Sequence, residues 1–424
     1  MKCAFYEREI TPPLGQSMPG YYAKRTATGV ADRLYAKVFA AELDNTKIAL
    51  LVIDCVELPT HYAEKIIKLA SLVNDIPEAN ISVTATHSHT AIPCGEPFVG
   101  LEDAEYMDIL VRIAADCITI AIKNLQQAEI FYGCGEVHGI SFNRNFILKD
   151  GRIVTHLSKN DRDGSRPYSD IDPKLPIMTV KNKNGSHLGA IISFACHQDC
   201  VGGTEYSGDF SSELALQLKE RYGKDFVSIF VAGASADINH VDYYSDSRTL
   251  ESLPHYRKMG RILAEKAATV MEESQQINIK KLNAYKEFIE LKCRQATAEQ
   301  IKAAQKALDE SGGKDWQAAL LLDYAKKQKE KVHRTPVQIF KLDEISIVLL
   351  PGEMYHQYAE MIRKACPDAK CIFATLANGA HGYIPLPELM DTDIYEAKLC
   401  EGSFLEKHAG DKITALAVKM IKRP

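Results

Sequence analysis

The chain has 424 residues, of which 46% are hydrophobic and 25% are charged, so it is long enough to bury a large core. A formal net charge of −5 disfavours nucleic acid or an anionic membrane surface as a partner. The sequence contains no run of about 18 apolar residues, so we expect no membrane-spanning helix.

The N-terminus and the cysteines bear on the cellular compartment. The first nine residues contain no apolar segment of the kind found in signal peptides. The 11 cysteines have no zinc-finger spacing, and we interpret most of them as buried thiols in a reducing environment. These observations predict a cytoplasmic protein, and they leave its oligomeric state open.

Hydrophobic periodicity predicts strands and helices that alternate along most of the chain. The extended segment 10–15 is followed by strands at 37–43, 47–53 and 81–83, with helices at 62–72 and 104–124. Further strands are predicted at 129–140, 154–156, 177–181, 188–195, 227–231, 345–350 and 371–376, with helices at 211–222 and 256–272 and one that ends at Ile362. This alternation predicts an α/β fold with a mixed, buried β-sheet core flanked by helices.

Residues 296–332 differ from their surroundings. They are rich in Ala, Lys, Glu and Gln, and Gly312 and Gly313 interrupt them. We predict a helical hairpin inserted in a single catalytic domain that spans residues 1–424. A solvated surface insertion is the favoured interpretation, and a lid over the site is the alternative.

Several residues with metal-binding or catalytic chemistry follow predicted strands directly. His87 and His89 lie just beyond the strand predicted at 81–83. On an extended chain, residues two apart point to the same side. The others in such positions are His197, Asp237, Glu353 and Tyr383. Loops beyond strand ends form the ligand sites of open α/β folds, and imidazoles with a carboxylate are the ligands of catalytic zinc.

Each of these residues also has a simpler interpretation when it is taken alone. His87 or His197 could be a core histidine, and Tyr383 could be a packed aromatic. Asp237 and Asn239 could cap turns, and Arg144 could be a salt-bridge donor. Only their coincidence at several strand ends predicts a metal site.

Motifs in a fixed order give the sequence a resemblance to a known family. They are Ile10-Thr11-Pro12-Pro13-Leu14-Gly15, Ala85-Thr86-His87-Ser88-His89, Phe142-Asn143-Arg144, Phe194-Ala195-Cys196-His197, Ser207-Gly208-Asp209, Leu350-Pro351-Gly352-Glu353, Gly382-Tyr383-Ile384 and Tyr395-Glu396. Together they resemble the neutral/alkaline non-lysosomal ceramidases over nearly the whole catalytic domain of that family.

The resemblance implies the α/β catalytic domain of the family and one Zn²⁺ per chain. By motif, the zinc ligands would be His87, His197, Glu353 and Tyr383. His89, Arg144 and Tyr395 would line the catalytic centre. Asp209 or Asp237 would then be a hydrogen-bond partner of a metal-bound histidine.

Two departures from the family concern the substrate and the domain content. In the segment that corresponds to the ceramide site, Asn239 lies two residues after Asp237, at the position where the family has a serine. We therefore assign Asp237 and Asn239 to substrate binding, with a changed specificity. The chain also ends at Pro424, without the C-terminal immunoglobulin-like domain of the family.

The resulting hypothesis is a zinc-dependent hydrolase that cleaves a C–N amide bond, or a related ester or lactone, with metal-activated water. Its substrate would be small and polar. One alternative is a true ceramidase that acts on N-acylsphingosine. Another is a non-catalytic metal-binding protein on a hydrolase scaffold.

Overall fold

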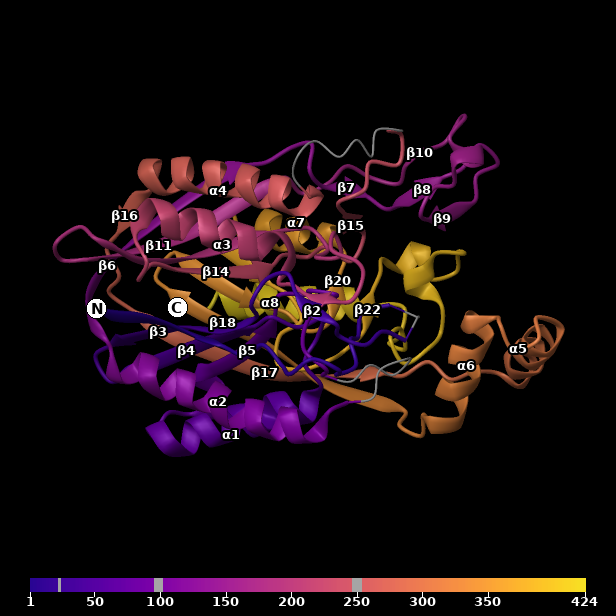
Figure 1. The fold of residues 1–424 in the computed structure, drawn as a ribbon, viewed down its shortest axis with the longest axis horizontal. Coiled ribbons are helices and arrows are strands. Elements are labelled where there is room, and N and C mark those ends of the chain that lie inside the picture. The colour runs from indigo at the N-terminus through magenta and orange to yellow at the C-terminus, as the bar shows by residue number, and fades with distance from the viewer. Residues whose placement is uncertain (22–23, 95–101, 246–253) are drawn as a thin grey trace.

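The computed structural model describes residues 1–21, 24–94, 102–245 and 254–424, and its largest element is a nine-stranded sheet (Figure 1). The strand order is β14-β12-β11-β6-β1-β3-β4-β5, and β16 pairs with β6. The strands are β1 (Lys2–Glu9), β3 (Tyr35–Leu43), β4 (Thr46–Ile53), β5 (Ile81–Ala85), β6 (Gln126–Glu136), β11 (Lys174–Asn182), β12 (His187–Phe194), β14 (Val227–Ala232) and β16 (Gln275–Ile277). β4 with β5 and β12 with β14 are parallel pairs, and the other pairs are antiparallel.

A second sheet packs against the first. It has the order β17-β18-β19-β21, with β17 (Leu282–Lys292), β18 (Val332–Leu342), β19 (Ile345–Leu349) and β21 (Lys370–Ala374). One apolar cluster takes side chains from this sheet, from β3 and β4, and from β11, β12 and β14; examples are Phe340, Leu50 and Ile191. The central core therefore lies between three β surfaces: the four-stranded sheet, the part of the nine-stranded sheet with β3 and β4, and the part with β11, β12 and β14.

Three pairs of helices cover the outer faces of these β surfaces. α1 (Thr60–Asn74) and α2 (Ala104–Lys123) pack on β3, β4 and β5, and α3 (Asp209–Tyr222) and α4 (His255–Glu273) pack on β6, β11, β12 and β14. α7 (His356–Ala365) and α8 (Ala409–Ile421) cover the four-stranded sheet. Figure 1 shows the first two pairs on opposite sides of the molecule. The predicted fold class, a mixed sheet core flanked by helices, is confirmed.

Short elements surround the end of the sheets that carries the site. They are β2 (Gly29–Val30), β7 (Phe142–Asn143), β8 (Asn145–Ile147), β9 (Ile153–Thr155), β10 (Arg166–Pro167), β13 (Glu205–Tyr206), β15 (Ile238–Asn239), β20 (Glu353–Met354) and β22 (Tyr383–Ile384). β20 pairs with β22, and β15 pairs with β7.

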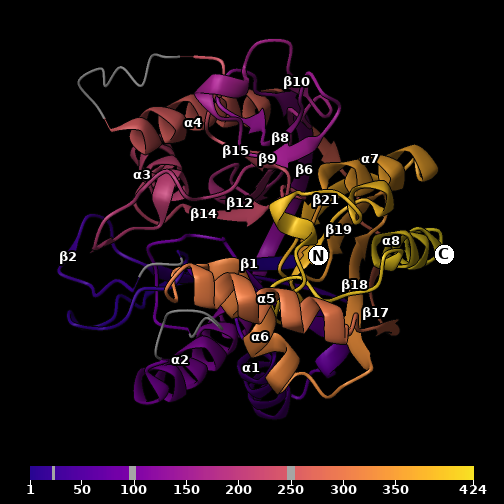
Figure 2. The same cartoon turned by 90° about the vertical axis from the view of Figure 1, so that its right-hand side faces the viewer.

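The segment predicted as a helical hairpin contains α5 (Ala298–Glu310) and α6 (Trp316–Lys327), which project from the body beside the site (Figures 1 and 2). α5 begins with a capping box between Thr297 and Gln300, which satisfies the first free backbone N–H groups of the helix. Its side chains are mostly exposed, as a surface insertion requires. α6 borders the cavity that is described below.

Among the described helices, none is both long and apolar enough to cross a membrane.

Candidate metal centre

The turn after β5 holds His87 in an unusual backbone conformation. Its φ is +72°, in the left-handed region that non-glycine residues rarely adopt, and such strain concentrates at functional sites. Its backbone N–H donates to the carbonyl of Cys55 at 2.9 Å. Nδ1 lies 2.7 Å from the carbonyl oxygen of Val56, so Nδ1 carries the proton and Nε2 presents its lone pair. The imidazole is 4% exposed and fixed in one tautomer.

His197, in the loop after β12, is fixed in the same way. Its backbone N–H donates to the carbonyl of Ile238, and its Nδ1 lies 2.9 Å from the carbonyl oxygen of Ser235. Nε2 of His197 is therefore also unprotonated and can act as an electron-pair donor. Both histidines are oriented by main-chain carbonyls, so the hypothesis that Asp209 or Asp237 performs this role is wrong.

Glu353 reaches the two imidazoles because of the residue before it. Gly352 has φ +60°, and a Cβ atom there would collide with the carbonyl oxygen of Gly382. This approach lets the N–H of Glu353 donate to that carbonyl at 2.9 Å. A glycine is thus required at position 352 to place the carboxylate.

Three electron-pair donors converge at the centre. Oε2 of Glu353 lies 3.2 Å from Nε2 of His87 and 3.3 Å from Nε2 of His197. Burial raises the pKa of Glu353, but the attraction of His87 and the contacts with both imidazoles hold that pKa well below its usual value. Within the described part of the chain, Oε2 is a buried oxygen without a hydrogen-bond partner. Such donors repel one another unless a proton or a metal ion lies between them.

His89 adds a third imidazole at the rim of this group. Its Nε2 lies 3.4 Å from Nε2 of His87, and the ligand atoms of His87, His89 and His197 all lie within 4.8 Å of one another. Its Nδ1 lies 2.6 Å from the carbonyl oxygen of Gly20. Burial and the neighbouring His87 lower the pKa of His89 to about 3, which keeps this imidazole neutral.

Arg144 approaches the centre from β7 and β8 and is 4% exposed. Nη1 lies 3.2 Å from Nε2 of His197, and Nε donates to Oε1 of Glu396 at 2.7 Å. Nη2 is buried and has no hydrogen-bond partner among the described residues. Glu396 is fully buried and also accepts from the hydroxyl of Thr155 at 2.7 Å. The charge of Arg144 is thus balanced inside the protein.

Tyr383 and Tyr395 stand beside this arginine. Tyr383 is paired with Glu353 in the β20–β22 register, and its ring centroid lies 5.3 Å from that of Tyr395. The guanidinium carbon of Arg144 lies 5.5 Å from the ring centroid of Tyr383 and 5.9 Å from that of Tyr395. All seven residues assigned to metal binding or catalysis are therefore brought to one end of the sheets. Their individual roles stay predictions.

Asp237 and Asn239 are buried in a segment that adjoins Arg144, whose backbone N–H donates to the carbonyl of Asp237 at 2.8 Å. Asp237 is fully buried, and its Oδ2 lies 2.7 Å from Nδ1 of His356 and accepts from Asn143 at 3.1 Å. Burial raises the pKa of Asp237, but His356 holds that pKa below its usual value. Asn239 donates to the hydroxyl of Tyr243 at 3.1 Å. Their assignment to substrate binding stays a prediction.

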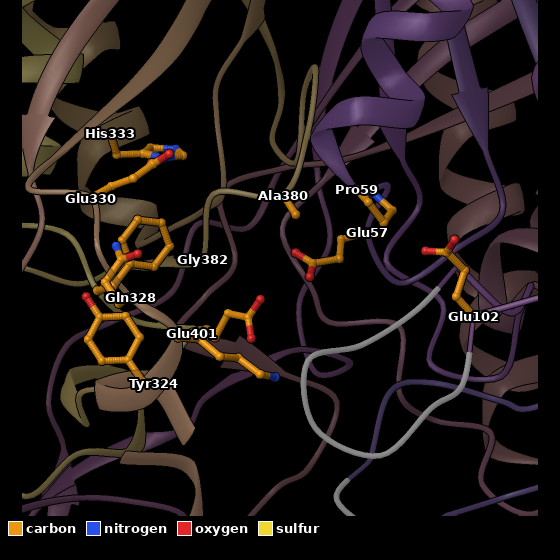
Figure 3. Close-up of a pocket in the computed structure, with 13 residues that line it drawn as sticks. Glu57, Pro59, Glu102, Tyr324, Gln328, Glu330, His333, Ala380, Gly382 and Glu401 are labelled. Carbon is orange, nitrogen blue, oxygen red and sulfur yellow. The ribbon is translucent and has the colours of Figure 1, made fainter. Parts of the chain in front are cut away.

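A cavity of about 570 Å³ adjoins the candidate metal centre (Figure 3). Glu57, which follows the carbonyl that holds His87, lies in its wall with Gly382, which holds Glu353. Figure 3 shows Tyr324 and Gln328 on one side and Glu102 on the other. The full lining is Glu57, Pro59, Glu102, Tyr324, Lys327, Gln328, Glu330, His333, Ala380, Gly382, Glu401, Gly402 and Phe404.

Residues 7–238, more than half of the chain, match the family model described as neutral/alkaline non-lysosomal ceramidase, N-terminal. The chain belongs to the neutral/alkaline non-lysosomal ceramidase family. This membership supports an amide-hydrolysing, ceramidase-like role.

The fold of this ceramidase-family chain also resembles two solved structures. One is the neutral ceramidase from Pseudomonas aeruginosa, with a TM-score of 0.77 and 17% identity over 99% of this chain and 74% of that chain. The other is a ceramidase complexed with C2, with a TM-score of 0.74 and the same identity and coverage. At this identity the likeness establishes the fold alone. Comparison with curated protein sequences gives no match.

The sequence left the role of two features without an assignment. Glu396 belongs to the Tyr395-Glu396 motif, but nothing in the sequence indicates that it is the buried partner of Arg144. α6 supplies Tyr324 and Lys327 to the cavity wall, and the ring centroid of Trp316 lies 6.3 Å from that of Tyr395. Whether the hairpin is a solvated insertion or a lid stays a prediction. Neither feature follows from periodicity, because both depend on contacts between distant segments.

Replacement of Glu396 with glutamine should lower the free energy of unfolding by about 3–5 kcal/mol, because it leaves the guanidinium of Arg144 buried without a counter-charge. Denaturant unfolding measures the change. Asp393→Asn is the control, since Asp393 is exposed in its pair with Lys398 and such pairs contribute about 1 kcal/mol or less. A loss below about 1 kcal/mol in Glu396→Gln would show that Arg144 is solvated in solution.

Proposed function

We propose that this chain is a zinc-dependent amidohydrolase that acts on a small polar amide, or on a closely related ester or lactone. The observation that carries the proposal is the group of lone pairs formed by Glu353, His87 and His197. Two imidazoles and one carboxylate are a ligand set of catalytic zinc.

The spacing of these donors fits the ion. A tetrahedral site with bonds of about 2.0–2.1 Å has ligand–ligand edges of about 3.3–3.4 Å. The separations of 3.2 and 3.3 Å between Oε2 of Glu353 and the two imidazole nitrogens match such edges. Tyr383, opposite Glu353 in β22, completes the proposed set. The main-chain carbonyls behind His87 and His197 supply the outer hydrogen bonds that metal-bound histidines require.

When bound, Zn²⁺ polarises a carbonyl group and lowers the pKa of a water molecule to about 7. The protein supplies the proton transfers. Because Nδ1 of His89 donates to Gly20, its Nε2 is free to accept the proton of the attacking water and to pass it to the leaving nitrogen. Nη2 of Arg144, for which the described residues offer no hydrogen-bond acceptor within reach, provides a donor for the oxygen that becomes negative, and Tyr395 stands beside it.

The walls of the cavity support a polar substrate. Among the described residues that line it, four have carboxylates, Glu57, Glu102, Glu330 and Glu401, and one has an ammonium group, Lys327. An acyl chain would remove water from these charged groups, which costs free energy. A volume of about 570 Å³ suits a small molecule.

Long-chain ceramide should therefore be hydrolysed with a kcat/KM at least about 100-fold lower than the best small polar amide, ester or lactone. The reason is that a site built for one pattern of hydrogen bonds rejects another. Steady-state assays of the zinc-loaded protein on both kinds of substrate measure the ratio.

The matched variant is Asn239→Ser, which introduces the hydroxyl that the resemblance places at this position. Asn239→Ser should reduce the difference in kcat/KM between long-chain ceramide and the best small substrate, without a change in zinc content. A rate on ceramide above that on every small substrate would instead establish the alternative function, a ceramidase acting on N-acylsphingosine.

A further inference from the structure

A second group of metal-binding side chains lies outside the catalytic centre. Cys200 is three residues beyond His197, His240 follows β15, and His255 is the first residue of α4. One ligand atom from each of the three lies within 4.8 Å of the others. Cys200 and His240 are half-buried and His255 is exposed. Three segments far apart in the sequence thus bring a sulfur and two imidazoles together.

A carboxylate lies beside the group. Oδ1 of Asp199 lies 3.3 Å from Nε2 of His240, so this carboxylate faces one imidazole of the cluster. The cluster itself consists of the sulfur of Cys200 and the imidazoles of His240 and His255. Carboxylates in this position orient metal-bound histidines in many proteins.

We propose that Cys200, His240 and His255 form a second metal site, which binds a borderline-soft divalent ion of the Zn²⁺ type, with Asp199 as the carboxylate that orients His240. A thiolate with imidazoles selects such ions over Mg²⁺ and Ca²⁺, which prefer oxygen ligands. Three protein ligands leave the fourth position of a tetrahedral ion for water. The ion would join the loop after β12 to the first turn of α4.

Cys200 is half-buried, and its Sγ lies 3.4 Å from Sδ of Met259. The metal ligand is the thiolate, so binding of an ion releases the proton of this thiol.

Titration of the metal-free full-length protein with Co²⁺ tests the proposal, because the proposed catalytic centre contains no sulfur. The wild-type protein should bind two equivalents and develop a thiolate-to-cobalt charge-transfer absorption. Cys200→Ser should lose one equivalent and the whole of this absorption. Cys134→Ser, at an exposed cysteine, is the matched control and should behave as the wild type does. His87→Ala should lose the catalytic equivalent and keep the absorption, which separates this proposal from the proposed function.

Binding of a single equivalent by the wild-type protein, or of a second one without thiolate absorption, would overturn the proposal. So would a Cys200→Ser protein that keeps the absorption. Where Cys200→Ser fails to fold, X-ray absorption of the zinc-loaded wild-type protein decides. A sulfur atom about 2.3 Å from zinc is expected, and its absence contradicts the site.

Discussion

Replacement of Glu353 with glutamine should remove the catalytic metal ion and lower kcat/KM by at least about 10²–10³-fold. The amide keeps the size of the side chain but loses the negative charge that two imidazoles face at 3.2 and 3.3 Å. Loss of one preorganised electrostatic group alone costs about that factor, and loss of the ion adds to it. His87→Ala should have the same result, because it removes another donor of the set.

Metal analysis and initial rates measure this effect, best in a Cys200→Ser background in which only the catalytic centre is counted. His138→Ala is the control, since His138 is exposed. If both Glu353→Gln and His87→Ala keep one ion per chain in that background, the ligand assignment is refuted.

Replacement of His89 with alanine should keep the metal ion and lower kcat by about 10²–10⁴-fold, with a small effect on KM. That range is the usual contribution of a positioned general acid or base. His89 qualifies because its Nδ1 is held by the carbonyl of Gly20 and its Nε2 faces the centre. Tyr383→Phe is the informative partner variant, because the resemblance makes Tyr383 the fourth ligand and His89 a catalytic residue.

The two variants should therefore differ in what they change. His89→Ala should lower turnover, and Tyr383→Phe should lower metal affinity. A His89→Ala protein that loses as much metal as His87→Ala would make His89 a ligand. The 3.4 Å separation between Nε2 of His87 and Nε2 of His89 would then be a ligand–ligand edge.

The sequence predicted the elements with simple periodicity. α2 was expected at 104–124 and is Ala104–Lys123, and the strand before His87 was expected where β5 lies. Four long elements had no counterpart in the prediction: β1, β17, β18 and α8. In β18, Pro336 argues against a strand with neighbours on both sides, but it lies opposite Phe288 of β17 and outside the segment paired with β19.

The residues of the site could be predicted from the sequence, but the groups that hold them in place could not. Strand-end positions and family motifs assembled His87, His197 and Glu353, and the structure places them together. The partners of the two histidines are main-chain carbonyls, which leave no trace in a list of side chains. The left-handed backbone conformation of His87 could not be predicted either, because the presence of a histidine does not indicate a positive φ.

The carbonyl supports have a consequence for how the protein tolerates mutation. Every residue type carries a main-chain carbonyl, so no single substitution at Val56 or Ser235 can delete the group that orients the neighbouring imidazole. Both side chains are buried, so size still matters there, but hydrogen-bonding chemistry does not. In a saturation scan these two positions should accept residues of similar volume and any polarity that packing allows. The centre is thus protected from a class of mutations that disables sites oriented by carboxylates.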